Sequence, residues 1–483
     1  MSTSSERILG AAGPVTALIW PLYGVAQTRA LENLHPAAST TLMQQAGLAL
    51  ARLTLALAPH ARQVWIACGP GNNGGDGLEA AAHLQQWGKQ VVASLVHDPE
   101  KSPPDAYCAW QAAKAAGVRF SDRAPAHYDV CVDALFGIGA LRPLQSAYAD
   151  WVAQMNSAHA PTIAVDLPSG LDAESGAVSD VHVVAQHTLS LLTLKPGLFT
   201  GSGRDACGEI WFNSLEVCDS TPPLAWLQAA PVLQPRAHAS NKGSYGDVCI
   251  VGGAPGMRGA VLLAARSALQ GGAGRVFACP LGEPDLALDA QCPELMFRRF
   301  EELDWSAMTL VAGCGGGQTI ADPLPRILRE AKRLVLDADA LNRISESPAL
   351  QELLRQRPNA STVLTPHPLE AARLLSVMVA AIQADRLHAA QALAERFACV
   401  VVLKGSGSII TAPGETPRIN PSGNAKLATA GTGDVLAGLI GAYMANGTSA
   451  LDAACEAAWR HGLAADRWPG PVLSASVLCQ WTD

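Results

Sequence analysis

Short apolar runs alternate with segments of helical periodicity along most of the chain. From residue 64 the order is VWIACG, LEAAAHLQQWG, QVVASLV, AYCAWQAAKAAG, DVCVDALFG and PTIAVDLP. A short β-branched or apolar run is typical of a buried strand, and apolar residues that recur every third or fourth position are typical of a helix. The alternation therefore predicts an α/β domain with a parallel sheet and crossover helices.

This pattern breaks where DSTPPLAWLQAAPVLQPR brings four prolines and no clear periodicity. Beyond it the alternation restarts with GDVCIVGG, GAVLLAARSALQGG, GRVFACP, MTLVAG, RLVLDAD, STVLTP and CVVVLKGSG, and ends with the helical segment DVLAGLIGAYMANG. A chain of 483 residues is too long for one ordinary hydrophobic core. We therefore predict one α/β domain over residues 1–220, a linker over 221–235 and a second α/β domain over 236–483.

Composition narrows the class of protein. Hydrophobic residues make up 49% and charged residues 16% of the chain, as expected for a soluble globular protein. The net charge of -8 and the lack of a long Lys or Arg run argue against nucleic acid or an anionic membrane as a partner. The N-terminus does not resemble a signal peptide, and no apolar run has the length of a membrane span, so we expect a cytoplasmic protein. The 12 cysteines form no CxxC pair and no cluster with histidine, so we expect reduced, buried thiols.

A first candidate site begins at GPGNNGGDG, residues 69–77, which follows a predicted strand and opens a predicted helix. Glycines let the backbone approach a phosphate, and the helix start offers N–H groups to an anion. The spacing is not GxGxxG, so it does not predict an intact nicotinamide-binding fingerprint. The alternative is a glycine-rich turn with both asparagines in left-handed conformations.

Two further strand ends carry polar side chains that we expect to converge on the same crevice. Asp133 lies in VDALFGIGALR, and Asp166 and Ser169 lie in AVDLPSGLD. A hard cation could be coordinated by the Asn73 amide oxygen, the Asp133 carboxylate and backbone carbonyls near Ser169. Asp166 would then be free for proton transfer, although it could instead cap a turn.

The segments GPGNNGGDG, VDALFGIG and VDLPSGLD, with LMQQAGLALA before them and HTLSLLTLKPGL after them, resemble the NAD(P)H-hydrate epimerase family over roughly residues 22–217. The resemblance implies a Rossmann-like three-layer domain, Asp166 as the acid/base, and potassium bound by Asn73, Asp133 and Ser169. Ile138 and Ala82 depart from the family, which usually has Thr and Arg there. The residues implied to contact the hydrated dinucleotide are Asn72, Asn73, Gly74, Gly75, Asp76, Gly137, Ile138, Gly139, Ala140, Leu141 and Arg142.

A second candidate site is NAKLATAGTGD, residues 424–434, directly before an apolar helix. Glycines at a helix start can form an anion hole from backbone amides, and Asp434 in the first turn would lie beside a phosphate in transfer. Asp434 could accept the proton of a hydroxyl that is being phosphorylated. The alternative is a carboxylate that only interacts with the helix dipole.

Other polar motifs follow the strands before this helix. KGSGS at residues 404–408 could bind nucleotide phosphates or ribose, and LTPHP at 364–368 holds His367 between two prolines. Together with NKGSYGDVCIVGG, LDADALN and NAKLATAGTGDVLAG, they resemble the ADP-dependent NAD(P)H-hydrate dehydratase family, a branch of the ribokinase-like fold, over roughly residues 230–480. Leu369 stands where that family usually has Gly. The resemblance implies that Mg²⁺ and ADP are used, that Ala260, Gly315, His367 and Asp434 face the hydrated cofactor, and that the nucleotide contacts Lys404, Gly405, Ser406, Gly407, Ser408 and Gly433.

Both resemblances together imply a bifunctional enzyme that repairs hydrated NADH and NADPH, and we expect it to form a homo-oligomer. Two other hypotheses stay open at this point. The chain could be a small-molecule kinase of the ribokinase class with an accessory domain, because that whole class shares Gly-Thr-Gly-Asp. The N-terminal domain could also act only as a nucleotide-sensing or oligomerising module, because a fold does not fix a function.

Overall fold

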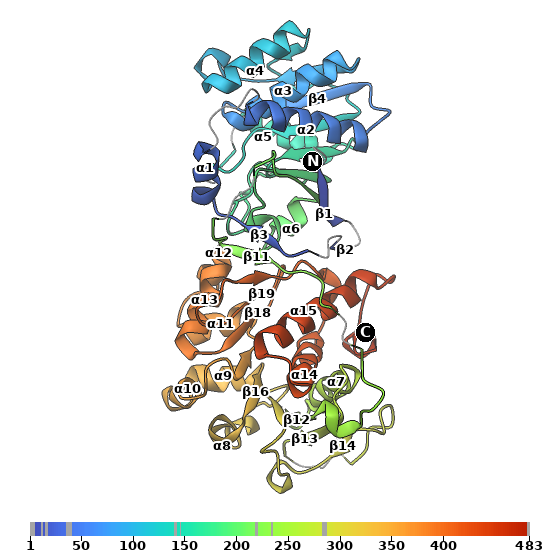
Figure 1. Ribbon diagram of the computed structural model, residues 1–483, viewed down its shortest axis with the longest axis vertical. Coiled ribbons are helices and arrows are strands. Elements are labelled where there is room, and N and C mark those ends of the chain that lie inside the picture. Colours follow the sequence, from blue (N-terminus) through green and yellow to red (C-terminus); the bar gives the residue numbers. More distant parts are fainter. Residues whose placement is uncertain are drawn as a thin grey trace. The chain divides into compact units, whose positions relative to one another are not determined.

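The computed structural model describes residues 5–10, 13–14, 18–34, 41–139, 143–144, 146–217, 221–232, 235–282 and 287–480 (Figure 1). Internal contacts divide the chain into two compact units, Met1–Ala225 and Trp226–Asp483. Each unit is built on its own parallel-rich sheet. The border between the units lies inside the proline-rich segment that breaks the sequence pattern.

Seven parallel strands form the centre of the N-terminal unit, in the order β10-β9-β8-β7-β4-β5-β6. The strand β1 adds antiparallel to β10, and β2 adds to β1. The chain runs outward from β4 in one direction through β5 and β6, and from β7 in the other direction through β8 to β10. The strands are β1 (Glu6–Gly10), β2 (Gly13–Pro14), β4 (Gln63–Cys68), β5 (Gln90–Ser94), β6 (Arg119–Ser121), β7 (Val130–Ala134), β8 (Thr162–Val165), β9 (His187–Leu191) and β10 (Glu209–Asn213), with β3 (Trp20–Leu22) outside this sheet.

Helices cover both faces of this sheet, as the alternation of side chains along β4 shows. Ile66 belongs to a buried cluster with residues of α2 (Leu42–Leu57), α3 (Asn72–Gln86) and α4 (Pro104–Ala115). Trp65 belongs to a separate cluster with residues of α5 (Ala147–Ser157). This arrangement confirms the three-layer α/β domain. The remaining helices of the unit are α1 (Val25–Leu34) and α6 (Gly203–Ala206).

The sheet of the C-terminal unit has the order β14-β13-β12-β15-β16-β17-β18-β19-β20-β11. The strands from β14 to β18 are parallel, and β19 runs antiparallel to β18 and β20. The strands are β11 (Ala225–Leu227), β12 (Asp247–Gly252), β13 (Arg275–Pro280), β14 (Met296–Phe297), β15 (Thr309–Ala312), β16 (Arg333–Leu336), β17 (Thr362–Leu364), β18 (Val400–Leu403), β19 (Ile409–Thr411) and β20 (Arg418–Ile419).

Three helices pack on one face of this sheet: α7 (Arg258–Gln270), α14 (Thr432–Ala445) and α15 (Ala450–Arg467). The helix α14 is buried along nearly its whole length, which explains its apolar sequence without a polar face. The helix α13 (Arg386–Phe397) packs on β18 and β19 through side chains that lie outside this cluster. The other helices are α8 (Leu324–Glu330), α9 (Asp339–Glu346), α10 (Pro348–Arg355), α11 (Pro368–Leu375), α12 (Val379–Ala384) and α16 (Ala475–Leu478).

The strands and helices expected from the alternating pattern are present in both units. The antiparallel strands β1, β19 and β20 have no counterpart in the prediction, and KGSGS forms the turn between β18 and β19. The eleven cysteines in the described part of the chain are free thiols, and nine of them are buried. No described helix combines the length and apolar character that a membrane span requires.

Trp65 offers a test of the N-terminal core. Its side chain is fully buried between the rings of Tyr128 and Trp151, and its indole N–H donates to Ser94 Oγ at 3.0 Å. We expect Trp65→Ala to lower the free energy of unfolding of this unit by about 3–5 kcal/mol. Hydrogen exchange of β4 and β7 peptides measures this loss, with peptides of the C-terminal unit as an internal reference. Trp87→Ala, at a half-exposed ring, should cost less than about 1 kcal/mol; equal losses for both variants would contradict the assignment.

Candidate active sites

The first site lies at the carboxyl ends of β4, β7 and β8, which are neighbours in the sheet. The chain leaves β4 and β7 in opposite directions, which is the position at which open α/β sheets bind ligands. Gly69 links the ends of these two strands, because its amide donates to Ala134 O at 3.0 Å. A Cβ on Gly69 would lie 1.7 Å from the carbonyl oxygen of Leu135, so only glycine fits there.

Asn72 and Asn73 form the first turn of α3 and have ordinary helical backbone angles. The alternative of a turn with both asparagines in left-handed conformations is therefore wrong. Gly74 and Gly75 are buried and serve close packing, Gly74 against the Gly69 carbonyl group and Gly75 against α2 and α4. Their expected contact with a dinucleotide stays a prediction.

Asp133 and Ser169 form a buried pair that links the ends of β7 and β8. The Asp133 carboxylate accepts the Ser169 amide at 2.8 Å, the Ser169 hydroxyl at 2.7 Å and the Leu135 amide at 3.2 Å. The side chain is fully buried, and burial raises the pKa of Asp133 to about 6 although these hydrogen bonds oppose the shift. Among the described residues no cationic side chain pairs with Asp133.

Asp166 follows β8 in a left-handed backbone conformation, with φ of 65°, which is costly for a residue with a side chain. Its carboxylate accepts the Leu191 amide at 3.2 Å and forms an ion pair with Lys195, whose side chain is fully buried. Lys195 also donates to the Leu191 carbonyl at 2.8 Å. The ion pair fixes the Asp166 carboxylate.

Gly137 marks the point where three predicted site residues meet. A Cβ added to Gly137 would lie 3.1 Å from Asn73 Oδ1 and 3.5 Å from Asp166 Oδ2. The buried Asn73 Nδ2 has no hydrogen-bond partner among the described residues. Ile138 and Gly139 continue this loop, whereas Ala140, Leu141 and Arg142 lie outside the described residues.

The negative charge of Asp166 affects the pKa of a carboxyl group near the start of α3. Burial, followed by the charges of Asp166 and Glu32, raises the pKa of Asp76 well above its ordinary value. Burial and the charge of Asp166 likewise raise the pKa of Glu32 on α1. The site thus places two carboxyl groups with raised pKa, Asp76 and Glu32, near one carboxylate that is paired to lysine.

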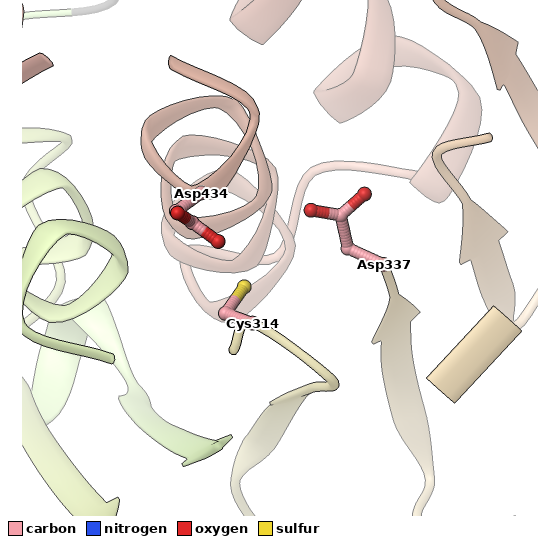
Figure 2. Close-up of side chains that lie close together, drawn as sticks. All are labelled: Cys314, Asp337 and Asp434. Carbon is pink, nitrogen blue, oxygen red and sulfur yellow. The ribbon is translucent and has the colours of Figure 1, made fainter. Parts of the chain in front are cut away.

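The second site lies at the carboxyl ends of β12, β15, β16, β17 and β18, five consecutive strands of the C-terminal sheet. The first turn of α14 meets these strand ends and presents Asp434. Ligating atoms of Asp434, Asp337 and Cys314 lie within 4.8 Å of one another (Figure 2). Figure 2 shows the Cys314 sulfur beneath both carboxylates, with Asp434 on the helix and Asp337 at the end of β16.

Burial, helped by the charge of Asp337, raises the pKa of Asp434 to about 7. The neighbouring Cys314 thiol and the charge of Lys404 act in the opposite direction. A carboxyl group whose pKa lies near neutrality is suited to accept a proton from a hydroxyl at physiological pH. The role of Asp434 as a base stays a prediction, and so does the alternative of a carboxylate that only interacts with the helix dipole.

Lys404 neutralises Asp337. The ammonium group donates to Asp337 Oδ1 at 2.7 Å, and the Thr365 hydroxyl donates to the same oxygen at 2.7 Å. A Cβ on Gly433 would lie 3.4 Å from Lys404 Nζ, so this predicted nucleotide contact adjoins the ion pair. The rest of the predicted nucleotide segment, Gly405 to Ser408, forms the turn that follows Lys404.

His367 has a structural task in addition to the predicted contact. Its Nδ1 accepts the amide of Leu369 at 3.1 Å, and its own amide donates to Glu370 Oε2 at 2.8 Å, so the two residues cap α11 reciprocally. Burial lowers the pKa of His367, and the charge of Lys404 adds to this effect. The Leu369 side chain is 43% exposed, so leucine in place of the family's glycine leaves the cap intact.

Ala260 and Gly315 contact each other next to Cys314. Gly315 has φ of 57°, and a Cβ there would lie 2.7 Å from the Ala260 Cβ. The structure therefore brings Ala260, Gly315 and Cys314 to one edge of the second site and His367, Lys404 and Asp337 to the other.

Comparisons with known proteins agree with the division of the chain into two α/β units. Residues 248–478 match the family described as NAD(P)H-hydrate dehydratase, and residues 39–197 match the YjeF-related protein N-terminus family. The bifunctional NAD(P)H-hydrate repair enzyme Nnr of Escherichia coli (strain K12) is 36% identical over 448 residues, covering 88% of this chain and 84% of the relative. Its namesake in Coxiella burnetii is 34% identical over 468 residues, covering 92% and 94%. The chain belongs to the bifunctional NAD(P)H-hydrate repair enzyme family.

Among solved structures, an ADP/ATP-dependent NAD(P)H-hydrate dehydratase from Bacillus subtilis, co-crystallised with ATP and Mg²⁺, is 26% identical. It covers 52% of this chain and 92% of its own, with a TM-score of 0.42. The family assignment itself rests on the sequence relatives. Membership of the repair enzyme family confirms the fold classes expected for both domains and favours repair over the kinase hypothesis.

Sequence reasoning missed the roles of two residues in this repair enzyme. Lys195 lies in HTLSLLTLKPGL, and a lysine in an otherwise apolar segment was a signal that a buried partner exists. Cys314 lies between glycines in AGCGGG, shortly after the strand β15, but a lone cysteine gives no such signal. Only the approach of three strand ends and a helix places its sulfur beside two carboxylates.

The buried ion pair gives a prediction. Lys195→Met leaves Asp166 without its countercharge, so we expect the free energy of unfolding of the N-terminal unit to fall by about 3–5 kcal/mol. The double variant Asp166→Asn with Lys195→Met removes both charges and should recover much of this loss. Hydrogen exchange of β8 and β9 peptides provides the measurement. Additive losses in the double variant would mean that the two side chains do not interact.

Proposed function

We propose that the N-terminal domain interconverts the R and S hydrates of NADH and NADPH, and that the C-terminal domain dehydrates the S hydrate at the expense of ADP. The products are NAD(P)H, AMP and phosphate, and the two activities are those of an isomerase and a lyase. The observation that carries this proposal is the pair of carboxyl groups, Asp166 and Asp434, each held at the strand ends of its own domain in a chain whose full-length relatives are named repair enzymes.

Asp166 is the proposed acid/base of the epimerase reaction. The hydrate carries a hydroxyl group on a carbon next to the ring nitrogen, so proton transfer to this hydroxyl labilises the C–O bond and allows the configuration to be lost and regained. The contact with Lys195 holds the carboxylate in one orientation beside Gly137 and Asn73. Burial, followed by the charge of Asp166, raises the pKa of Asp76, so a second carboxyl group lies within reach of the Asp166 charge.

The residues around Asp133 fit a potassium ion. Asp133 is a buried carboxylate without a cationic partner among the described residues, and Asn73 Oδ1 and the carbonyl groups near Ser169 are the oxygen ligands that such an ion prefers. We propose that Asn73, Asp133 and Ser169 hold potassium in the epimerase domain. When bound, the ion supplies positive charge for the anionic dinucleotide.

Asp434 is the proposed base of the dehydratase reaction. It accepts the proton of the S hydrate hydroxyl as that oxygen attacks the terminal phosphorus of the nucleotide, while the amides at the start of α14 face the developing negative charge. Phosphate is a far better leaving group than hydroxide. The ring nitrogen then expels phosphate, the adjacent carbon loses a proton, and the dihydropyridine is restored.

The nucleotide is proposed to lie along Lys404, Gly405, Ser406, Gly407, Ser408 and Gly433. The turn between β18 and β19 offers backbone amides and hydroxyl groups, and Lys404 supplies positive charge. Magnesium fits here as the counterion of the nucleotide phosphates, because Lys404 already neutralises Asp337. Ala260, Gly315 and His367 would face the hydrated ring.

Recovery of dihydronicotinamide absorbance tests both assignments in one experiment. With mixed R and S NADH hydrate, ADP and Mg²⁺, we expect wild type to restore all of the hydrate rapidly. Asp166→Ala should restore only the S portion rapidly, because its dehydratase domain is intact. Asp434→Ala should restore none, with kcat reduced by about a thousandfold or more.

Each variant controls for the folding of the other domain. Asp434→Ala should still equilibrate separated R and S hydrates, as followed by chromatography, and Asp166→Ala should still dehydrate pure S hydrate at the wild-type rate. A phosphorylated product that accumulates without recovery of absorbance would favour the kinase hypothesis instead.

Replacement of potassium tests the cation site. We expect epimerisation by wild type to fall at least about tenfold when potassium is replaced by a bulky organic cation that cannot enter the Asp133 site. Asp133→Asn should make the residual rate independent of potassium. Ser157→Ala, at an exposed serine on α5, should keep the wild-type potassium dependence; a potassium-independent wild type would refute the site.

A further inference from the structure

The Asp434 carboxylate lies in a demanding electrostatic environment. Burial, the charge of Asp337 and, more weakly, the charge of Asp339 disfavour its charged form. The cation that acts on it, Lys404, is engaged with Asp337 at 2.7 Å. A base in this position needs a donor that faces it directly. Another titratable group among the described residues that senses its charge is the thiol of Cys479, the residue after α16.

Cys314 supplies such a donor. Its side chain is fully buried directly after β15, and its carbonyl oxygen accepts the Gly253 amide at 2.8 Å. The glycines on either side have φ of 115° and 57°, so the backbone turns sharply at this residue. The thiol therefore cannot swing toward solvent, and Figure 2 shows it directed at the two carboxylates.

Asp337 and Asp434 differ in the hydrogen bonds that their carboxylates accept. Asp337 accepts bonds from both Lys404 and Thr365 on its Oδ1 atom. The Cys314 sulfur lies within 4.8 Å of a carboxylate oxygen of Asp434, and no lysine, arginine or hydroxyl group among the described residues donates to that carboxylate. The thiol proton therefore has its better acceptor in Asp434.

A metal ion is a poorer interpretation of the same three side chains. A soft divalent ion would need the thiolate, but burial and the charges of Asp434 and Asp337 raise the pKa of Cys314 well above its ordinary value. Lys404 also places a positive charge against Asp337, where such an ion would bind.

We propose that Cys314 is a positioning residue of the dehydratase site, whose thiol donates a hydrogen bond to Asp434 and holds that carboxylate in the orientation in which it accepts the substrate hydroxyl proton. This inference rests on the proposed dehydratase function. The thiol does not contact the reacting atoms; it acts through Asp434.

The consequence is a change in the pH dependence of the reaction. A hydrogen bond to the carboxylate stabilises its charged form and lowers the pKa of Asp434. Loss of the thiol raises that pKa, so the base becomes protonated at a higher pH. Dehydration must then weaken most on the acid side.

The test compares dehydration of pure S NADH hydrate by wild type, Cys314→Ala and Cys314→Ser, with ADP and Mg²⁺ at saturating concentrations. The rate is measured from about pH 5.5 to about pH 9, which is roughly 1.5–2 pH units on either side of neutrality. For Cys314→Ala we expect the acid limb of kcat to move up by about 0.5–1 pH unit, with kcat about three- to tenfold lower at the acid end and nearly unchanged at the alkaline end. Cys314→Ser, which keeps a donor, should restore the wild-type limb.

The matched control is Cys399→Ala, because Cys399 is an equally buried thiol at the opposite end of β18 from Lys404. It should leave the acid limb in place. If Cys314→Ala is not folded, as judged by its thermal midpoint, Cys314→Thr and Cys314→Val form a second pair of equal shape that differs in the donor.

The outcomes are distinct. A wild type that does not dehydrate the S hydrate overturns the proposed function, and this inference with it. If wild type is active and Cys314→Ala has the same acid limb of kcat as wild type, this inference alone is overturned. The same holds if the Cys314→Thr and Cys314→Val variants share one acid limb. Inhibition of wild type by micromolar Zn²⁺ that Cys314→Ala abolishes would replace the hydrogen bond with a metal site.

Discussion

Burial of carboxylates at the ends of parallel strands is the constraint on which both halves of this protein depend. Asp133, Asp166 and Asp337 each lie at or just beyond a strand end, and each is removed from water. A buried charge costs free energy unless hydrogen bonds or an opposite charge compensate it. The compensation differs from one carboxylate to the next, and these differences divide the chemical tasks.

In the N-terminal domain the compensation separates two carboxylates. Asp166 has the buried ammonium group of Lys195, whereas Asp133 accepts hydrogen bonds from Ser169 and the Leu135 amide. The first arrangement fixes the orientation of a carboxylate. The second leaves a carboxylate that no cationic side chain among the described residues balances, and a bound cation could do so.

In the C-terminal domain the same logic acts on Asp337 and Asp434. Lys404 pairs with Asp337 and not with Asp434. Burial therefore keeps the pKa of Asp434 at about 7, and this group can exchange a proton near neutral pH. The placement of one lysine therefore separates two neighbouring carboxyl groups, one paired with a cation and one with a raised pKa.

The sequence by itself determined the two α/β domains, because strand and helix periodicity are local properties, and it determined the strand-end motifs, because parallel strands bring their carboxyl ends to one edge. It pointed to Asp166 and Asp434 as candidate acid/base residues through motifs that resemble known families. The pairing of Lys195 with Asp166 and the approach of Cys314 to Asp434 were decided only by tertiary structure. These contacts join segments 29 and more residues apart, and no local pattern encodes which charges meet after such segments pack.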